Sequence, residues 1–184
     1  MKIGVILAAG LLGLVLSFSQ AEHMLVKFDG GIGVDPVSNA QGMDPVATVV
    51  TRNIVRGVQP AASWVIAKLK AEVKDDGRIA VDGRGLVFAS GDTIGTALVV
   101  TPTGGTAASL NVFATLICEN VAPFVERNTN PVPLAENGDF KIDDVLSPPP
   151  PSSCATPVLL IRSAGNGNWF AAGIQKFDGG HLPE

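Results

Sequence analysis

Histidine, the side chain that most often serves as a catalytic base near neutral pH, is scarce in this 184-residue chain. It occurs twice, as His23 beside an expected processing point and as His181 near the carboxyl terminus, and we expect both to be solvated. The sequence also lacks the Gly-x-Ser-x-Gly elbow of serine hydrolases, the His-Glu-x-x-His zinc motif and the glycine-rich loop that binds phosphate. No catalytic residue is predicted from these groups.

Paired carboxylates are the remaining groups that could do chemistry. Glycoside hydrolysis needs only two Asp or Glu side chains at a suitable separation, so a small extracellular hydrolase is the alternative function. Most of the available acids fall in predicted turns or on predicted solvent-facing strand positions, where a carboxylate only solvates the surface. The acids considered are Asp75, Asp76, Asp82, Asp92, Glu136, Asp139, Asp143 and Asp144.

A calcium site is a second hypothesis for some of the same acids. Calcium accepts carboxylate and loop carbonyl oxygens in flexible geometry, and Asp139, Asp143 and Asp144 supply such oxygens directly after Asn137-Gly138. The segment lacks the spaced acids of an EF-hand, and Asn-Gly is by itself a strong signal for a hairpin turn. A turn with solvated acids is therefore the competing interpretation, and calcium is the one cofactor that the sequence suggests.

Cys118 and Cys154 are the two cysteines of the chain, and we predict that they form a disulfide bond. Cysteines of an exported protein meet an oxidising compartment, which tends to join them. Zinc is a poor alternative because no histidine lies near either cysteine. In the chain-entropy estimate, closing a loop of this length stabilises the fold by about 4 kcal/mol.

Residues 1–21 have the order of a cleavable secretory signal peptide. A lysine at the second position supplies positive charge, and residues 3–18 then run without a charge. At about 1.5 Å per residue this helix would reach about 24 Å, short of the roughly 30 Å of hydrocarbon in a bilayer. Small residues end the segment, so we expect cleavage between Ala21 and Glu22, with the preceding serines as alternative sites. The expected location is secreted, periplasmic or cell-surface, without a stable membrane anchor after cleavage.

The charge balance argues against nucleic acid as a partner. Removing the signal peptide takes away one lysine and no acid, which leaves 12 basic against 17 acidic residues and a net charge of about −5. Nucleic acid binding depends on Lys and Arg that neutralise phosphates, and anionic membrane surfaces are disfavoured for the same reason. The expected partner is an extracellular protein or polysaccharide.

Turn residues and short apolar runs dominate the predicted fold. The chain has 21 glycines and 13 prolines, and the apolar residues between them either alternate with polar ones or form short continuous runs. The sequence predicts an all-β fold, an antiparallel β-sandwich or barrel of about eight or nine short strands preceded by a signal-peptide helix. Strand signals lie at residues 24–28, 48–59, 64–74, 78–82, 86–88, 97–101, 110–118, 139–146, 156–162 and 169–174.

Four parts of the chain are expected: a signal peptide at 1–21, an irregular N-terminal arm at 22–47, a single β domain at 48–174 and a C-terminal tail at 175–184. A domain of this size can bury about 70% of its unfolded surface. Within it, Asp75-Asp76-Gly77 predicts a hairpin turn. Trp64, Trp169 and the phenylalanines fit either a core or a platform for stacking carbohydrate.

One short motif occurs near both ends of the chain. Lys27-Phe28-Asp29-Gly30-Gly31 recurs as Lys176-Phe177-Asp178-Gly179-Gly180. Two edge strands that pair and each turn at Asp-Gly-Gly would explain this, and coincidence is the other explanation.

The predicted domain contains several short motifs of glycine, aromatic and aliphatic residues: Val55-Arg56-Gly57-Val58, Trp64-Val65-Ile66, Asp82-Gly83-Arg84-Gly85-Leu86, Phe113-Ala114-Thr115-Leu116-Ile117-Cys118, Cys154-Ala155-Thr156-Pro157-Val158-Leu159-Leu160-Ile161 and Trp169-Phe170-Ala171-Ala172. Together they resemble a group of small secreted, mainly bacterial, β-rich proteins with no assigned activity. The resemblance covers residues 49–174 and implies a single exported domain. It implies no function and no site.

The function that the sequence favours is an exported, non-catalytic β domain. Such a domain would be a structural, surface or binding module that presents loops such as 89–108 and 119–137 on a disulfide-tied scaffold. A hydrolase would instead need a cleft with two facing carboxylates, at least one of them with a raised pKa.

Overall fold

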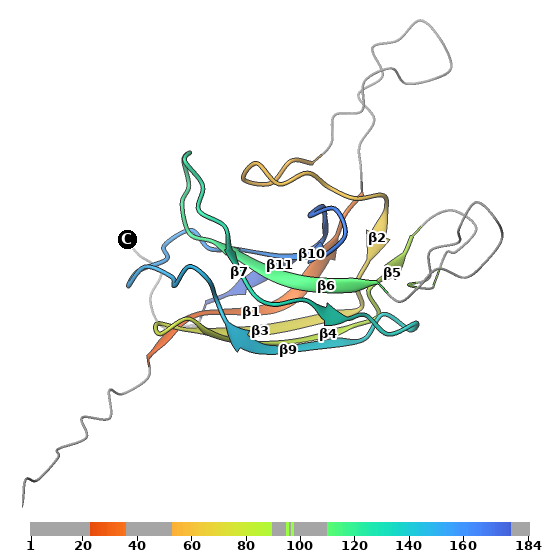
Figure 1. Ribbon diagram of the computed structural model, residues 1–184, viewed down its shortest axis with the longest axis horizontal. Coiled ribbons are helices and arrows are strands. Elements are labelled where there is room, and N and C mark those ends of the chain that lie inside the picture. Colours follow the sequence, from red (N-terminus) through yellow and green to blue (C-terminus); the bar gives the residue numbers. More distant parts are fainter. Residues whose placement is uncertain (1–22, 36–52, 90–94, 96, 98–109, 178–184) are drawn as a thin grey trace, which may run out of the picture.

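Eleven strands and no helix make up the described part of the chain (Figure 1). The structure is a computed structural model that describes residues 23–35, 53–89, 95, 97 and 110–177. The predicted signal peptide, its cleavage point between Ala21 and Glu22, and Asp92 and His181 lie outside these residues. Among the described residues, no helix is long and apolar enough to cross a membrane. The strands are β1 (Met24–Gly33), β2 (Trp64–Val65), β3 (Lys68–Lys74), β4 (Arg78–Arg84), β5 (Val87–Phe88), β6 (Asn111–Ile117), β7 (Arg127–Asn128), β8 (Val132–Pro133), β9 (Phe140–Val145), β10 (Val158–Ser163) and β11 (Trp169–Lys176).

One curled antiparallel sheet forms the body of the molecule, which confirms the predicted all-β class. Its order is β7-β6-β10-β11-β1-β3-β4-β9, with β8 also paired to β6. The sheet bends until Asn128 of β7 and Ser147, just after β9, exchange two backbone hydrogen bonds of 2.9 Å. The molecule is thus a half-barrel rather than a sandwich of two large sheets, and β2 and β5 form a small second sheet.

The hairpin of β3 and β4 forms as its alternating sequence predicts. Leu69, Ala71 and Val73 of β3 are buried, and the charged residues between them face solvent. The chain reverses at the predicted turn, where Gly77 has a φ of 89°, a conformation that glycine adopts without steric cost. The predicted strand 64–74 divides into β2 and β3, because the two parts pair with different strands, β5 and β4.

The first and last described strands, β1 and β11, pair in the middle of the sheet. β1 lies within the predicted arm 22–47, and β11 ends just inside the predicted tail 175–184. β1 lies between β11 and β3, where Phe28 is buried, and β11 extends to Lys176. Lys27 lies opposite Lys176, so the two copies of the short motif begin at paired positions, in central rather than edge strands. The strand predicted at 24–28 is the first half of β1. Three glycines hid the second half, because glycine is unfavourable inside strands.

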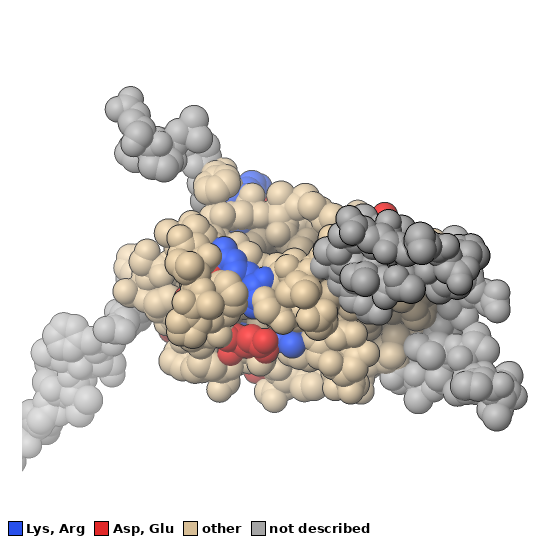
Figure 2. Space-filling model, turned by 90° about the horizontal axis from the view of Figure 1, so that it is seen from above, with Lys and Arg blue, Asp and Glu red and all other residues tan. Residues whose placement is uncertain are grey.

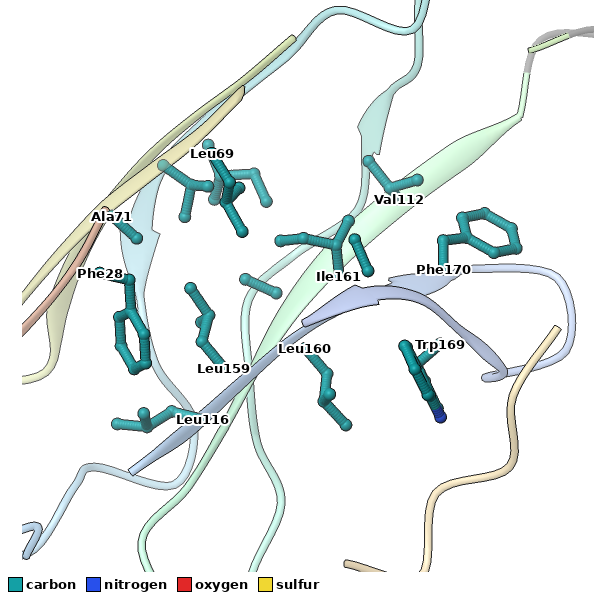
Figure 3. Close-up of a cluster of buried hydrophobic side chains, with 14 of the residues drawn as sticks. Phe28, Leu69, Ala71, Val112, Leu116, Leu159, Leu160, Ile161, Trp169 and Phe170 are labelled. Atoms are coloured by element: carbon teal, nitrogen blue, oxygen red, sulfur yellow. The ribbon is translucent and has the colours of Figure 1, made fainter. Parts of the chain in front are cut away.

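Apolar side chains pack on both sides of β10 and β11 (Figure 3). Leu160 and Trp169 lie on one side and are buried. Successive strand residues point to opposite faces, so Leu159 and Ile161 lie on the other side, inside the curl. This burial of both faces explains why the sequence of β10 is a nearly continuous apolar run. Also inside the curl are Phe28, Leu69, Ala71, Val112, Leu116 and Phe170.

Residues 53–62 cover the outer side of β11. The backbone amide of Trp169 donates a hydrogen bond of 2.9 Å to this segment. The described end of the predicted strand 48–59 is therefore not a strand. It turns sharply instead, with backbone hydrogen bonds of 2.9 and 3.0 Å between Val55 and Val58.

Cys118 and Cys154 form a disulfide bond, as predicted, with 4.9 Å between their Cα atoms. The bond joins the residue after β6 to the segment that leads into β10. The Thr156 hydroxyl adds a hydrogen bond of 3.1 Å to the Cys118 carbonyl. The predicted loop 119–137, which starts here, contains the short strands β7 and β8.

Candidate functional site

The carboxylates considered for calcium do not meet. Asp139 precedes β9 and accepts the Gly85 amide at 3.1 Å. Asp143 and Asp144 are adjacent in β9, so their side chains point to opposite faces, and Asp144 accepts the Asn130 amide at 2.6 Å. Nowhere in the described residues do three His, Cys, Asp or Glu side chains gather at one point. The pleat of β9 thus separates the Asp143 and Asp144 oxygens, and the calcium site stays a prediction.

Four of the acids considered for hydrolysis, Asp76, Asp82, Asp139 and Asp144, are held by cations or by backbone amides. The Arg84 side chain lowers the pKa of Asp82, and a hydrogen bond from the Arg78 amide lowers the pKa of Asp76. A carboxylic acid that donates a proton at neutral pH needs the opposite, a pKa raised by its surroundings. Every described carboxylate whose pKa departs from its ordinary value has it lowered.

Two buried arginines tie the segment after the disulfide to the sheet. Arg127 makes two hydrogen bonds to Glu119, the shorter of 2.8 Å, and this pairing lowers the pKa of Glu119 to about 2. Arg162 pairs with Glu126 and lies 5.2 Å from the centre of the Phe113 ring. Neither arginine has a buried nitrogen without a partner. They therefore stabilise the fold.

Trp64 of β2 is the centre of an aromatic cluster at the end of the curl where β2 and β5 lie. Its ring stacks on the Phe170 ring with centroids 4.2 Å apart, and its centroid lies 4.1 Å from that of Phe88. Trp64 is 2% exposed and Trp169 is 4% exposed, so neither forms an open platform for carbohydrate. Both are core residues, which was the other interpretation of the sequence.

A close approach of two backbone segments holds Trp64 in this position. The Trp64 amide donates to the Val34 carbonyl at 2.8 Å. A Cβ atom on Gly33 would lie only 2.0 Å from the Trp64 carbonyl oxygen, so only glycine fits there. On the other side Trp64 pairs with Phe88 of β5. β2 is therefore clamped between the end of β1 and β5.

The larger of two hollows beside Trp64 has a volume of about 590 Å³ and lies along the end of β1. Glycine backbone and the half-exposed Val65 form much of its lining. Its two polar side chains already interact, because the Ser63 hydroxyl donates to Asp35 at 3.4 Å. This hollow offers a ligand few groups that lack a partner.

The smaller hollow has a volume of about 230 Å³, an aromatic wall and a polar rim. The three rings of the aromatic cluster form the wall. Ser163, Asn166 and Asn168, around the turn between β10 and β11, form the rim. The Asn168 amide donates to the Asn166 side chain at 3.1 Å, and the Gly167 amide donates to the Ser163 carbonyl at 2.9 Å, so the turn is fixed. None of the described lining residues is charged.

The indole Nε1 of Trp64 is buried and has no hydrogen-bond partner, although buried N–H groups nearly always have one. The indole of Trp169 does have one, because it donates to the Asn53 carbonyl at 2.9 Å. Arg56 Nη1 is the other described buried side-chain atom without a partner, but its neighbouring Nη2 donates to the Thr156 carbonyl. Among the described residues, the Trp64 N–H and its hollow are the feature that best fits a ligand.

No protein-family model, no curated protein and no solved structure matches the chain. The resemblance to small secreted bacterial proteins therefore stays an expectation, and the chemistry of the hollow is the guide to function.

Proposed function

We propose that the protein is an exported, non-catalytic β domain that serves as a surface or binding module, with the hollows beside Trp64 as its binding end. The observation that carries the proposal is the buried indole N–H without a partner next to an aromatic-walled hollow. Proteins leave few buried donors unpaired, so this end of the curl stands out from the rest of the described core. The pKa values of Asp76, Asp82, Glu119 and Asp144 are all lowered, which favours binding over hydrolysis by a protonated carboxylic acid at these residues.

The disulfide bond supports export. A bond between Cys118 and Cys154 is consistent with an oxidising compartment, and the pattern of residues 1–21 predicts the route to it. The location that follows is secreted, periplasmic or cell-surface. On the face shown in Figure 2, the few charged side chains gather near the centre and most of the described surface around them is uncharged. The partner that we propose is an extracellular protein or polysaccharide.

Expression of the full chain in a bacterial host tests export. We expect mass spectrometry of the exported fraction to find a protein that starts at Glu22, and Cys118 and Cys154 to resist alkylation until they are reduced. The variant Leu12→Arg, which puts a charge into the apolar run, should keep the chain in the cytosol. An uncleaved wild-type chain with two free thiols would contradict the proposal.

Catalysis is tested separately on the exported protein. We expect no release of reducing ends or free amines from extracellular polysaccharides and proteins. Reproducible turnover of one of them would favour the carboxylate hydrolase instead.

A further inference from the structure

We infer that the larger hollow beside Trp64 binds an aliphatic ligand that carries an ammonium group, and that the Asp35 carboxylate accepts hydrogen bonds from this group. The inference rests on the proposed binding function and names the chemistry of the ligand.

The size of the larger hollow and the exposure of its lining suit a ligand that enters from solvent. Its volume of about 590 Å³ lies within the range of about 300–1,000 Å³ that is usual for small-molecule sites, whereas the smaller hollow, of about 230 Å³, lies below this range. Ile32 is 62% exposed and Val65 is 48% exposed, and Asp35 is exposed as well. A ligand can therefore reach these three side chains without moving the core.

The apolar lining of the larger hollow is mainly aliphatic. Ile32 near the end of β1 and Val65 of β2 line it together with the half-buried Ile66. Trp64 is the one aromatic residue among its described lining residues, and it is 2% exposed, so a ring has no open aromatic face on which to stack. Exposed aliphatic side chains that share a hollow release water when an apolar chain covers them. The lining therefore favours an aliphatic chain.

Asp35 gives the larger hollow its charge, since it is the one charged residue among the described lining residues. The Ser63 hydroxyl donates to its Oδ1 at 3.4 Å, a long contact that occupies one of the several acceptor positions of a carboxylate. The Asn53 side chain fixes the backbone here by donating to the Asp35 carbonyl at 2.9 Å. An ammonium group has the opposite charge and carries only donors, so it complements Asp35, whereas an anion would be repelled.

Three matched compounds test the inference on the exported wild-type protein. Hexylamine, 1-hexanol and hexanoate share an aliphatic chain and end in a cation, a neutral group and an anion. In a titration at neutral pH followed by ¹H–¹³C methyl NMR, we expect hexylamine to shift the signals of Ile32 and Val65 and to leave that of Val145, which is exposed on β9, in place. 1-Hexanol should bind about 5-fold more weakly, the effect of one exposed ion pair, and hexanoate more weakly still. Equal binding of the three compounds, or unmoved Ile32 and Val65 signals, would overturn the inference.

A lysine of an extracellular protein carries the same ammonium group on the same kind of chain. The peptide acetyl-Gly-Lys-Gly-amide, titrated beside hexylamine, distinguishes the two sources of the ligand. Tighter binding of the peptide would assign the hollow to a lysine of a protein partner, and tighter binding of hexylamine would assign it to a small amine. Binding of neither would overturn the inference.

Two variants separate the charge from the aliphatic lining. Asp35→Asn keeps the shape and removes the charge, so hexylamine should bind about 5-fold more weakly and 1-hexanol as before. Val65→Thr keeps the shape and removes apolar surface, so both compounds should bind more weakly. The matched control Asp29→Asn removes the same charge from β1 outside the hollow, where Asp29 pairs with Lys176, and should bind both compounds as the wild type does.

Equal losses of hexylamine affinity in Asp35→Asn and Asp29→Asn would overturn the assigned acceptor. Failure of the proposed function would look different, since it would appear as an uncleaved, reduced chain or as turnover of a polymer.

Discussion

Trp64 and Trp169 are both buried, yet the fold treats their indole N–H groups differently. Trp169 lies beneath residues 53–62, and this segment supplies the Asn53 carbonyl as an acceptor at 2.9 Å. Trp64 lies at the end of the curl, where two aromatic rings cover it and no described group accepts its N–H. Residues 53–62 therefore supply a hydrogen-bond acceptor for the Trp169 indole, whereas Trp64 has no acceptor and lies beside a hollow.

The two regions also differ in what holds them together. The covering layer, residues 53–62, relies on the Arg56 side chain as well as on backbone hydrogen bonds to Trp169. The Arg56 guanidinium lies 5.8 Å from the centre of the Phe124 ring, which belongs to the segment that Arg127 and Glu119 tie together close to the disulfide. The end of the curl depends on backbone contact, with Gly33 pressed against the carbonyl of Trp64. Substitutions can therefore lower the stability of the end of the curl and of the covering layer separately.

The largest effect is expected at the backbone contact. Gly33→Ala would bring a Cβ atom to 2.0 Å from the Trp64 carbonyl oxygen, which forces β2 away from β1. We expect the free energy of unfolding, measured with urea, to fall by about 3 kcal/mol. Gly165→Ala is the matched control, since its Cβ would meet only the Ser163 hydroxyl at 3.6 Å. Equal stability of the two variants would show that the contact at Gly33 does not position β2.

A smaller and pH-dependent effect is expected in the segment after the disulfide, which the covering layer contacts through Phe124. Arg127 lowers the pKa of Glu119 from 4.5 to about 2 in the folded state, so the unfolded chain takes up the proton first. The stabilisation is therefore fully present above about pH 4.5 and is lost as the pH falls towards 2. Glu119→Gln should lower the free energy of unfolding by about 2 kcal/mol at neutral pH, after allowance for partial exposure of the pair.

The difference between wild type and Glu119→Gln should vanish near pH 2 in urea titrations across this range. The exposed Glu136 provides a control, because Glu136→Gln should change stability little at any pH. A Glu119→Gln effect that is the same at pH 7 and at pH 2 would contradict the assigned pairing.

The smallest expected effect is the difference in stability between phenylalanine variants of the two tryptophans. Trp169→Phe removes a satisfied donor and leaves the Asn53 carbonyl unpaired, whereas Trp64→Phe removes a donor that has no partner. Both variants lose the same side-chain volume. We expect the free energy of unfolding to fall further in Trp169→Phe, by about 1 kcal/mol more than in Trp64→Phe. A larger loss in Trp64→Phe would show that its N–H has an acceptor within the protein.

Local patterns in the sequence predicted the parts of the fold that depend on neighbouring residues. The alternation of β3 and β4 and the turn at Gly77 predicted their hairpin, and the apolar run of β6 predicted a strand covered on both faces. β1 was missed as a central strand because its glycines interrupt the pattern, and because one of the strands that bury it, β11, lies far away in the sequence. Strand pairing over such distances leaves no local signal.

The candidate site could not be predicted for a similar reason. Its wall and rim come from β2, β5, β10 and β11, and no short motif contains them together. The sequence suggested the acids as candidates because carboxylates can do chemistry. In the structure the strand pleat separates Asp143 from Asp144, and arginines pair with Asp76 and Asp82. Whether an indole N–H finds an acceptor depends on which chain segment covers it, and this is decided only in the folded molecule.

The pairing of β1 with β11 also sets an order of events in folding. Phe28 of β1 is covered only when the last described strand has been added. Contacts between residues so far apart in the sequence form late, because a long loop must close before they are made. The sheet thus cannot be completed on a partly synthesised or partly translocated chain. For the export proposed above, this order would keep the chain extended while it passes through a membrane pore and let it become compact on the far side.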